Sequence, residues 1–214
     1  MSDLKLGSDN TPRFQWVIQN DPIGPNLPYD VELRNHSVAG VVPTKGSLVE
    51  NWMLVIPRQP LPSLADASIN VRKEVLQIGR HESAAGTGSK ERWFNFEHGS
   101  RNAGDVIGCG VDQAHLHVVP LPFDLLRVAT TNQQDLAWFE VNTHDPWSEI
   151  PVGVDYYLVS DFLQTFLAYP ATGESQYFRK LIARELGQPD RWDYRKYGCE
   201  TNVKATIDSR HLRN

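Results

Sequence analysis

The sequence has 214 residues, of which 22% are charged, and a net charge of −5 at pH 7. This composition indicates one globular domain, or one domain with a substantial extension. The charge argues against a protein that coats nucleic acid, and the lack of an apolar run of about 18 residues argues against a membrane span. The N-terminus lacks the apolar core of a secretory signal, and two distant cysteines make no disulfide framework, so we expect a cytoplasmic protein.

The first 122 residues predict an N-terminal arm followed by a core. Residues 1–28 are rich in Pro, Asn and Asp and predict an irregular arm. Apolar runs and alternation predict five antiparallel strands, at 29–35, 37–43, 52–57, 92–97 and 111–120. Between the third and fourth strands, Val71, Val75 and Ile78 have helical spacing, with Ser68 as the N-cap of one long helix.

Residues 123–214 predict an extension that packs on this core. Residues 130–141 suggest a short helix, and residues 154–161 alternate as a strand. Residues 174–186 predict a helix that begins at Glu174 or Ser175 and ends before Gly187. The tail from residue 190 is mostly polar. The expected class is α+β, with an antiparallel sheet of about five strands, a long helix and a C-terminal strand–helix extension.

The segment "DQAHLHVV" (112–119) places two histidines inside an apolar run. Alternate residues of a strand point to the same face, so Gln113, His115 and His117 share one face. Ala114, Leu116 and Val118 would share the other, apolar face. The Gly-rich loop before this strand lets the strand pair with residues 92–97 as a hairpin. We expect Glu97 to lie near the two histidines on the neighbouring strand.

A pair of histidines two residues apart has several explanations. Two partly buried imidazoles held by hydrogen bonds would need no functional role. Metal binding is a second explanation, but neither the acid that a cupin pattern requires nor a large barrel is indicated. The third is covalent catalysis, in which an imidazole attacks phosphorus and carries a nucleotidyl group. A second histidine and the Gly-rich loop would then donate N–H groups to the phosphate oxygens.

The sequence over residues 29–122 resembles the histidine triad (HIT) superfamily. "DQAHLHVV" is similar to the signature His-φ-His-φ-His-φ-φ, where φ is apolar. "PTKGSLVENWMLVIPR" looks like the strand entry Pro-x-x-Gly-x-Leu-x-x-Gly-His-x-Leu-x-x-Pro. "FEHG" and "GCGVD" resemble the loop that leads into the triad in a bacterial branch. The segment "ESQYFRKLIARELGQPDRWDY" is similar to an extension of some bacterial relatives.

The resemblance implies three catalytic residues. His115 occupies the position of the nucleophile that attacks the α-phosphorus, and His117 that of the histidine contacting the α-phosphate. Gln113 stands at the first triad position, which is a departure from the family pattern, as is Asn51-Trp52 in place of Gly-His. Gly110 appears where short members hold a leaving-group serine.

The resemblance also implies nucleotide-binding residues around the triad. The nucleoside would lie against residues 29–43, and the helix at 174–186 would present its N-terminus to outer phosphates. The expected nucleotide-binding residues are Leu33, Val38, Val41, Pro43, Glu97, Gly108, Gly110, Ser175, Gln176 and Arg179. For His98, a hydrogen bond within the loop and a place at the site are both open.

Three functions follow from these patterns. The first is a nucleotide hydrolase or nucleotidyltransferase acting at the α-phosphorus of an ester, anhydride or amidate through a covalent nucleotidyl-histidine. The second is a catalytically reduced nucleotide-binding protein, and the third is a metal-dependent hydrolase. For the first, no cofactor or metal site is expected, although a divalent metal could accompany the substrate. The expected partner is a small nucleotide, without nucleic acid or membrane, and the family resemblance allows a homodimer.

Overall fold

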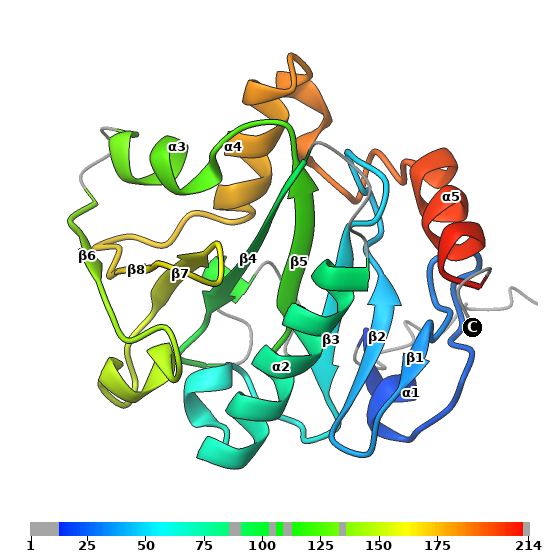
Figure 1. The fold of residues 1–214 in the computed structure, drawn as a ribbon, viewed down its shortest axis with the longest axis horizontal. Helices are drawn as coiled ribbons and strands as arrows, with labels where there is room; N and C mark the ends of the chain where they lie inside the picture. Colours follow the sequence, from blue (N-terminus) through cyan, green and yellow to red (C-terminus); the bar gives the residue numbers. More distant parts are fainter. Residues whose placement is uncertain (1–12, 86–90, 103–105, 109–112, 133–135, 212–214) are drawn as a thin grey trace, which may run out of the picture.

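A computed structural model describes residues 13–85, 91–102, 106–108, 113–132 and 136–211. These residues form one antiparallel sheet of eight strands with helices on both faces (Figure 1). The strand order across the sheet is β1-β2-β3-β5-β4-β7-β8-β6. The expected α+β class with an antiparallel sheet is confirmed, but the expected number of about five strands is too small.

The first half of the chain supplies five strands. They are β1 (Arg34–Asn35), β2 (Ala39–Pro43), β3 (Met53–Pro57), β4 (Arg92–Gly99) and β5 (Leu116–Leu121). The predicted pairing of the last two is confirmed by their antiparallel ladder. The first strand is shorter than predicted, because the Asp30 carboxylate accepts hydrogen bonds from the backbone and side-chain N–H groups of Asn26 and holds this stretch in a turn.

The second half of the chain widens the same sheet. Its strands are β6 (Trp138–Glu140), β7 (Tyr156–Ser160) and β8 (Thr165–Ala168), and β7 pairs directly with β4. The helix predicted over 130–141 is wrong. Helix α3 (Leu125–Thr131) begins earlier, because the Asp124 side chain caps it by accepting the N–H of Arg127 at 3.1 Å. Residues 138–140 instead pair with β8.

Some of the remaining helices were predicted from the sequence, and others were not. They are α1 (Gln15–Ile18), α2 (Ile69–Ala85), α4 (Tyr177–Glu185) and α5 (Glu200–His211), with 3₁₀ turns η1 (Leu64–Asp66), η2 (Val106–Gly108), η3 (Pro146–Glu149) and η4 (Pro189–Trp192). The predicted cap of α2 is confirmed, since Ser68 Oγ accepts the Val71 N–H at 3.4 Å. Gly187, with φ of +69°, follows α4 as predicted. Helix α5 lies in the polar tail and was not expected.

The two faces of the sheet are covered by different helices. Helix α2 crosses one face in front of β3 and β5 (Figure 1). Ala114, Leu116 and Val118 are buried on this face, as the alternation predicts. The other face is covered by α3 and α4 over β4, β5 and β7, and by α1 over β2 and β3.

Helix α5 fastens the end of the chain to the turn before β3. Asn51 has φ of +62° and donates its backbone N–H to Thr206 Oγ1 at 2.8 Å. Arg210 donates to Asn51 Oδ1 at 3.2 Å and forms a buried ion pair with Glu82 of α2 at 2.9 Å. These contacts fix a left-handed turn directly before Trp52. None of the described helices is both long and apolar enough to cross a bilayer.

We expect Leu116→Ala to lower the free energy of unfolding by about 2–5 kcal/mol, because it leaves a cavity under α2. Leu116 is fully buried, whereas Leu163 in the β7–β8 turn is 84% exposed. The matched change Leu163→Ala should stay within about 0.5 kcal/mol of the parent. Chemical denaturation of both variants measures the difference, and equal stabilities would contradict the assignment of Leu116 to the core.

Candidate active site

The two histidines lie on the face of the sheet opposite α2. The ring of His117 stacks on Phe96 of β4, with centroids 4.3 Å apart and planes inclined by 13°. His115 directly precedes β5, and its ring centroid lies 5.0 Å from that of His117. The predicted sharing of one face by these two side chains is confirmed.

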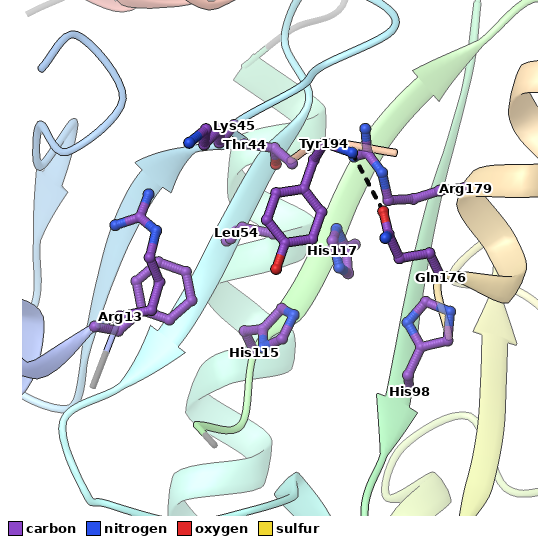
Figure 2. A pocket seen from close by; sticks show the side chains of 11 residues that line it. Arg13, Thr44, Lys45, Leu54, His98, His115, His117, Gln176, Arg179 and Tyr194 are labelled. Carbon is purple, nitrogen blue, oxygen red and sulfur yellow. Dashed lines mark hydrogen bonds between the residues drawn. The ribbon is translucent and has the colours of Figure 1, made fainter. Parts of the chain in front are cut away.

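A pocket opens over the histidines between the α1 and α4 covers (Figure 2). Arg13 and Phe14 flank it on the α1 side, and Figure 2 shows the ring of Tyr194 extending into it with the hydroxyl directed toward His115. The full lining comprises Arg13, Phe14, Thr44, Lys45, Leu54, His98, His115, His117, Gln176, Arg179 and Tyr194.

The hydrogen bond of the His115 ring leaves the lone pair of its other nitrogen, Nε2, directed away from the backbone. Its Nδ1 lies 2.7 Å from the backbone carbonyl oxygen of Gln113. A carbonyl only accepts, so Nδ1 carries the proton in the neutral ring and Nε2 keeps the lone pair. His115 therefore has the tautomer that a nucleophile acting through Nε2 requires.

The hydrogen bonds of His117 set the opposite tautomer. The indole N–H of Trp52 donates to Nδ1 of His117 at 3.0 Å. Because Nδ1 accepts, the proton of the neutral ring is on Nε2, which is free to donate. The two neighbouring imidazoles thus provide one lone pair and one N–H donor.

His98 joins this pair from β4. Its Nε2 accepts the backbone N–H of Phe178 at 3.2 Å, and its ring centroid lies 6.2 Å from that of His117. The sequence left open whether His98 bonds within the loop or lies at the site, and the last residues of β4 bring it to the same face as His117. His98 therefore lies between His117 of β5 and the first turn of α4.

All three imidazoles are held in the neutral form. Burial lowers the pKa of His98 to about 3 and lowers the pKa of His117 well below 6.5, with further contributions from neighbouring histidines and Arg179. Burial is also the main cause that lowers the pKa of His115, against the hydrogen bond to Gln113, which raises it. The positive charge of the pocket therefore comes from Arg13, Lys45 and Arg179, not from histidine.

The side chain of Gln113 does not reach into the pocket. It is buried, and its amide N–H groups donate to the carbonyl oxygens of Pro57 at 3.0 Å and Gln59 at 2.8 Å. Gln113 thereby ties the start of the histidine strand to the end of β3. Its backbone carbonyl, not its side chain, contacts His115.

The expectation that Glu97 lies near the histidines is wrong. Phe96, not Glu97, is opposite His117 in the β4–β5 ladder, so Glu97 points to the α2 face. There its carboxylate accepts hydrogen bonds from the Leu64 N–H, the Trp147 indole and the Tyr156 hydroxyl at 2.6–2.8 Å. Burial raises the pKa of Glu97 to about 7. It holds η1 and η3 under the sheet.

The other expected nucleotide-binding residues divide into two groups. Gln176 and Arg179 line the pocket. Leu33 and Val41 belong to the core on the opposite face, and the alternation of β2 places Pro43 on that face too, so the expectation that these three contact the nucleoside is wrong. Val38 and Ser175 are not among the described lining residues, and Ser175 borders a separate groove. Gly108 ends η2, and its expected contact with a nucleotide stays a prediction. Gly110 lies outside the described residues.

No known protein-family profile matches the sequence, and no curated protein matches it. Two solved structures are similar to the chain. A Hit-like protein involved in cell-cycle regulation from Bartonella henselae is 19% identical, with a TM-score of 0.37, over 52% of this chain and 78% of that one. Yeast Ap4A phosphorylase Apa2 is 11% identical, with a TM-score of 0.42, over 82% of this chain and 73% of that one.

At these identities and TM-scores, neither similarity bears on the family or the reaction of this chain. The pocket also contains residues that were not among the expected site residues. Thr44 and Lys45 directly follow a predicted strand, and this position at a strand end was a usable signal. Arg13 and Tyr194 come from irregular segments, and no pattern in the sequence indicated them.

Among the described residues, no group of three His, Cys, Asp or Glu side chains is arranged to hold a metal ion. The hydroxyl of Thr44 is buried in the pocket wall and makes no hydrogen bond within the described parts of the chain. The wall therefore offers a hydroxyl, an imidazole N–H and cationic side chains. This set suits the oxygens of a phosphate group.

We expect Gln113→Glu to destabilise the protein by about 3 kcal/mol or more, because it buries a carboxylate against two carbonyl oxygens. Gln59→Glu adds the same charge to the neighbouring loop, where the side chain is exposed, and should have little effect. Denaturant titration of both variants gives the comparison. If Gln113→Glu were as stable as Gln59→Glu, the two buried amide hydrogen bonds would be disproved.

Proposed function

We propose that the protein is a nucleotide hydrolase or nucleotidyltransferase in which His115 attacks the α-phosphorus of a nucleotide ester, anhydride or amidate. The observation that carries the proposal is the pair of opposite tautomers in one pocket. Nε2 of His115 has a lone pair, and Nε2 of His117 has a proton. A nucleophile beside an N–H donor is what attack on a phosphate group requires.

The first step forms the bond from His115 Nε2 to phosphorus and breaks the bond from phosphorus to the leaving group. The imidazole then bears a positive charge, which its Nδ1–H shares with the Gln113 carbonyl oxygen. In the second step, water or another phosphate displaces the histidine and takes the nucleotidyl group. The imidazole returns to the neutral form.

The charges in the pocket support an anionic substrate. Arg13 pairs with Asp30, and its partly exposed guanidinium still lines the pocket. Lys45, just after the end of β2, lies over the ring of Tyr29 and also lines the pocket. No carboxylate is among the described lining residues, so a phosphate meets no opposing negative charge there. The local cationic field compensates for the net negative charge of the chain.

Two alternative functions have less support from the site. A catalytically reduced binding protein would use the same phosphate contacts without forming the covalent bond. A metal-dependent hydrolase finds no ligand set among the described residues. Metal analysis of the purified protein tests that alternative, and a stoichiometric tightly bound metal would favour it over covalent catalysis.

We expect protein incubated with α-³²P-labelled nucleotides to trap acid-labile label on histidine. His115→Ala should lose the label and at least about 10³-fold of the turnover, because the nucleophile is removed. His144→Ala changes an exposed histidine outside the pocket and should keep both. Nucleotide binding without label in the parent protein would instead support the binding-protein alternative.

The acid limb of the pH profile of kcat/KM should lie below pH 6.5. Only neutral His115 is nucleophilic, and burial lowers its pKa, so the reactive form persists to more acidic pH than for an ordinary histidine. The charge of Arg13 contributes to this lowering. Arg13→Gln should therefore move the acid limb toward higher pH. An acid limb above pH 6.5 in the parent, or no shift in the variant, would contradict this account.

A further inference from the structure

We propose that Trp52 is a positioning residue that fixes His117 in the tautomer whose Nε2–H faces the pocket. The inference rests on the proposed function, because the imidazole that it orients contacts the substrate phosphate in that mechanism. Trp52 itself is fully buried beside the pocket and is not among the residues that line it.

The geometry leaves His117 little freedom. The indole N–H of Trp52 donates to Nδ1 at 3.0 Å, and the two rings meet edge to face with centroids 5.8 Å apart. Phe96 stacks on the imidazole at 4.3 Å and also packs edge-on against the indole at 5.9 Å. The ring of His117 is therefore held by a hydrogen bond in its plane and by an aromatic face.

The hydrogen bond also restricts the protonation of His117. An imidazolium would carry a proton on Nδ1, which would then face the indole N–H. The surroundings of the ring add to this restriction, since burial disfavours a positive charge on His117 and the guanidinium of Arg179 opposes it. His117 therefore acts as a neutral donor to a phosphate oxygen and takes no part in proton transfer. The proton for a leaving group comes from a different group.

The position of the indole is itself set by parts of the chain outside the histidine strand. The guanidinium of Arg179 from α4 lies over the Trp52 ring, 4.8 Å from its centroid. The Asn51 turn, which α5 holds, directly precedes Trp52. The orientation of Trp52 does not depend on a ligand, so the donor on His117 is arranged before the substrate binds.

Trp52 also stands where the HIT pattern has a histidine. An indole N–H only donates and does not titrate, whereas a histidine at this position could accept or donate and could change its charge near neutral pH. Compared with the HIT pattern, a histidine that could titrate is therefore replaced by a tryptophan that can only donate a hydrogen bond.

The experiment is ¹⁵N NMR of protein labelled on histidine, which reports the tautomer of each ring without requiring turnover. In the parent protein, His117 should show a protonated Nε2 and an unprotonated, hydrogen-bonded Nδ1. Trp52→Phe keeps the aromatic ring and removes only the indole N–H. In this variant His117 should populate both tautomers and titrate at higher pH, and kcat/KM for a nucleotide substrate should fall by about 10-fold.

Trp147→Phe is the matched control. Trp147 is equally buried and donates its indole N–H to Glu97 at 2.7 Å, but on the opposite face of the sheet. This variant should lose stability and leave the His117 signals unchanged. The proposal is overturned if His117 in the parent protein is protonated at Nδ1, if Trp52→Phe leaves its tautomer unchanged, or if Trp147→Phe alters it equally. Absence of nucleotide turnover in the parent would refute the proposed function alone, because the NMR result stands without it.

Discussion

The site depends on the hydrogen bond from Nδ1 of His115 to the backbone carbonyl oxygen of Gln113. This bond of 2.7 Å decides which nitrogen holds the lone pair, and it is available because the carbonyl is fixed. The Gln113 amide fixes it by donating to the carbonyl oxygens of Pro57, at the end of β3, and of Gln59 just beyond it. Gln113 thus acts on His115 through its backbone, while its side chain anchors the start of the strand.

In the pocket, the hydrogen-bonding groups and the positively charged groups belong to different side chains. Three buried imidazoles remain neutral because desolvation disfavours their cations, and each gives its neighbours a defined donor or acceptor. Arginine and lysine side chains of the lining supply the positive charge. An anion in this pocket would meet permanent charges and fixed polar groups together. Neither set needs a proton to be gained or lost on binding.

The sequence predicted the part of the site that lies on one strand and missed the part that depends on pairing. Alternation within 113–119 was enough to place His115 and His117 on one face, because the period of a strand is a local property. The side on which Glu97 lies depends on the register between β4 and β5, where a shift of one residue exchanges the two faces. Phe96 therefore occupies the position that Glu97 was expected to fill. The alternation of residues 154–161 predicted β7, but its pairing with β4 was not predicted. That pairing, the strands β6 and β8, and the pocket residues from irregular segments follow from tertiary contacts, which no local pattern encodes.

The fastening of α5 to the Asn51 turn has a consequence for biosynthesis. Asn51 and Thr206 are separated by 155 positions, and Arg210 joins Glu82 across 128 positions. On the ribosome, β3 and β5 emerge long before α5 does. A nascent chain can pair its central strands at that stage, but the turn beside Trp52 gains its partners only when the last helix leaves the exit tunnel. Closing such distant contacts is slow, so the pocket wall beside Trp52 should take its final form only after α5 has been synthesised.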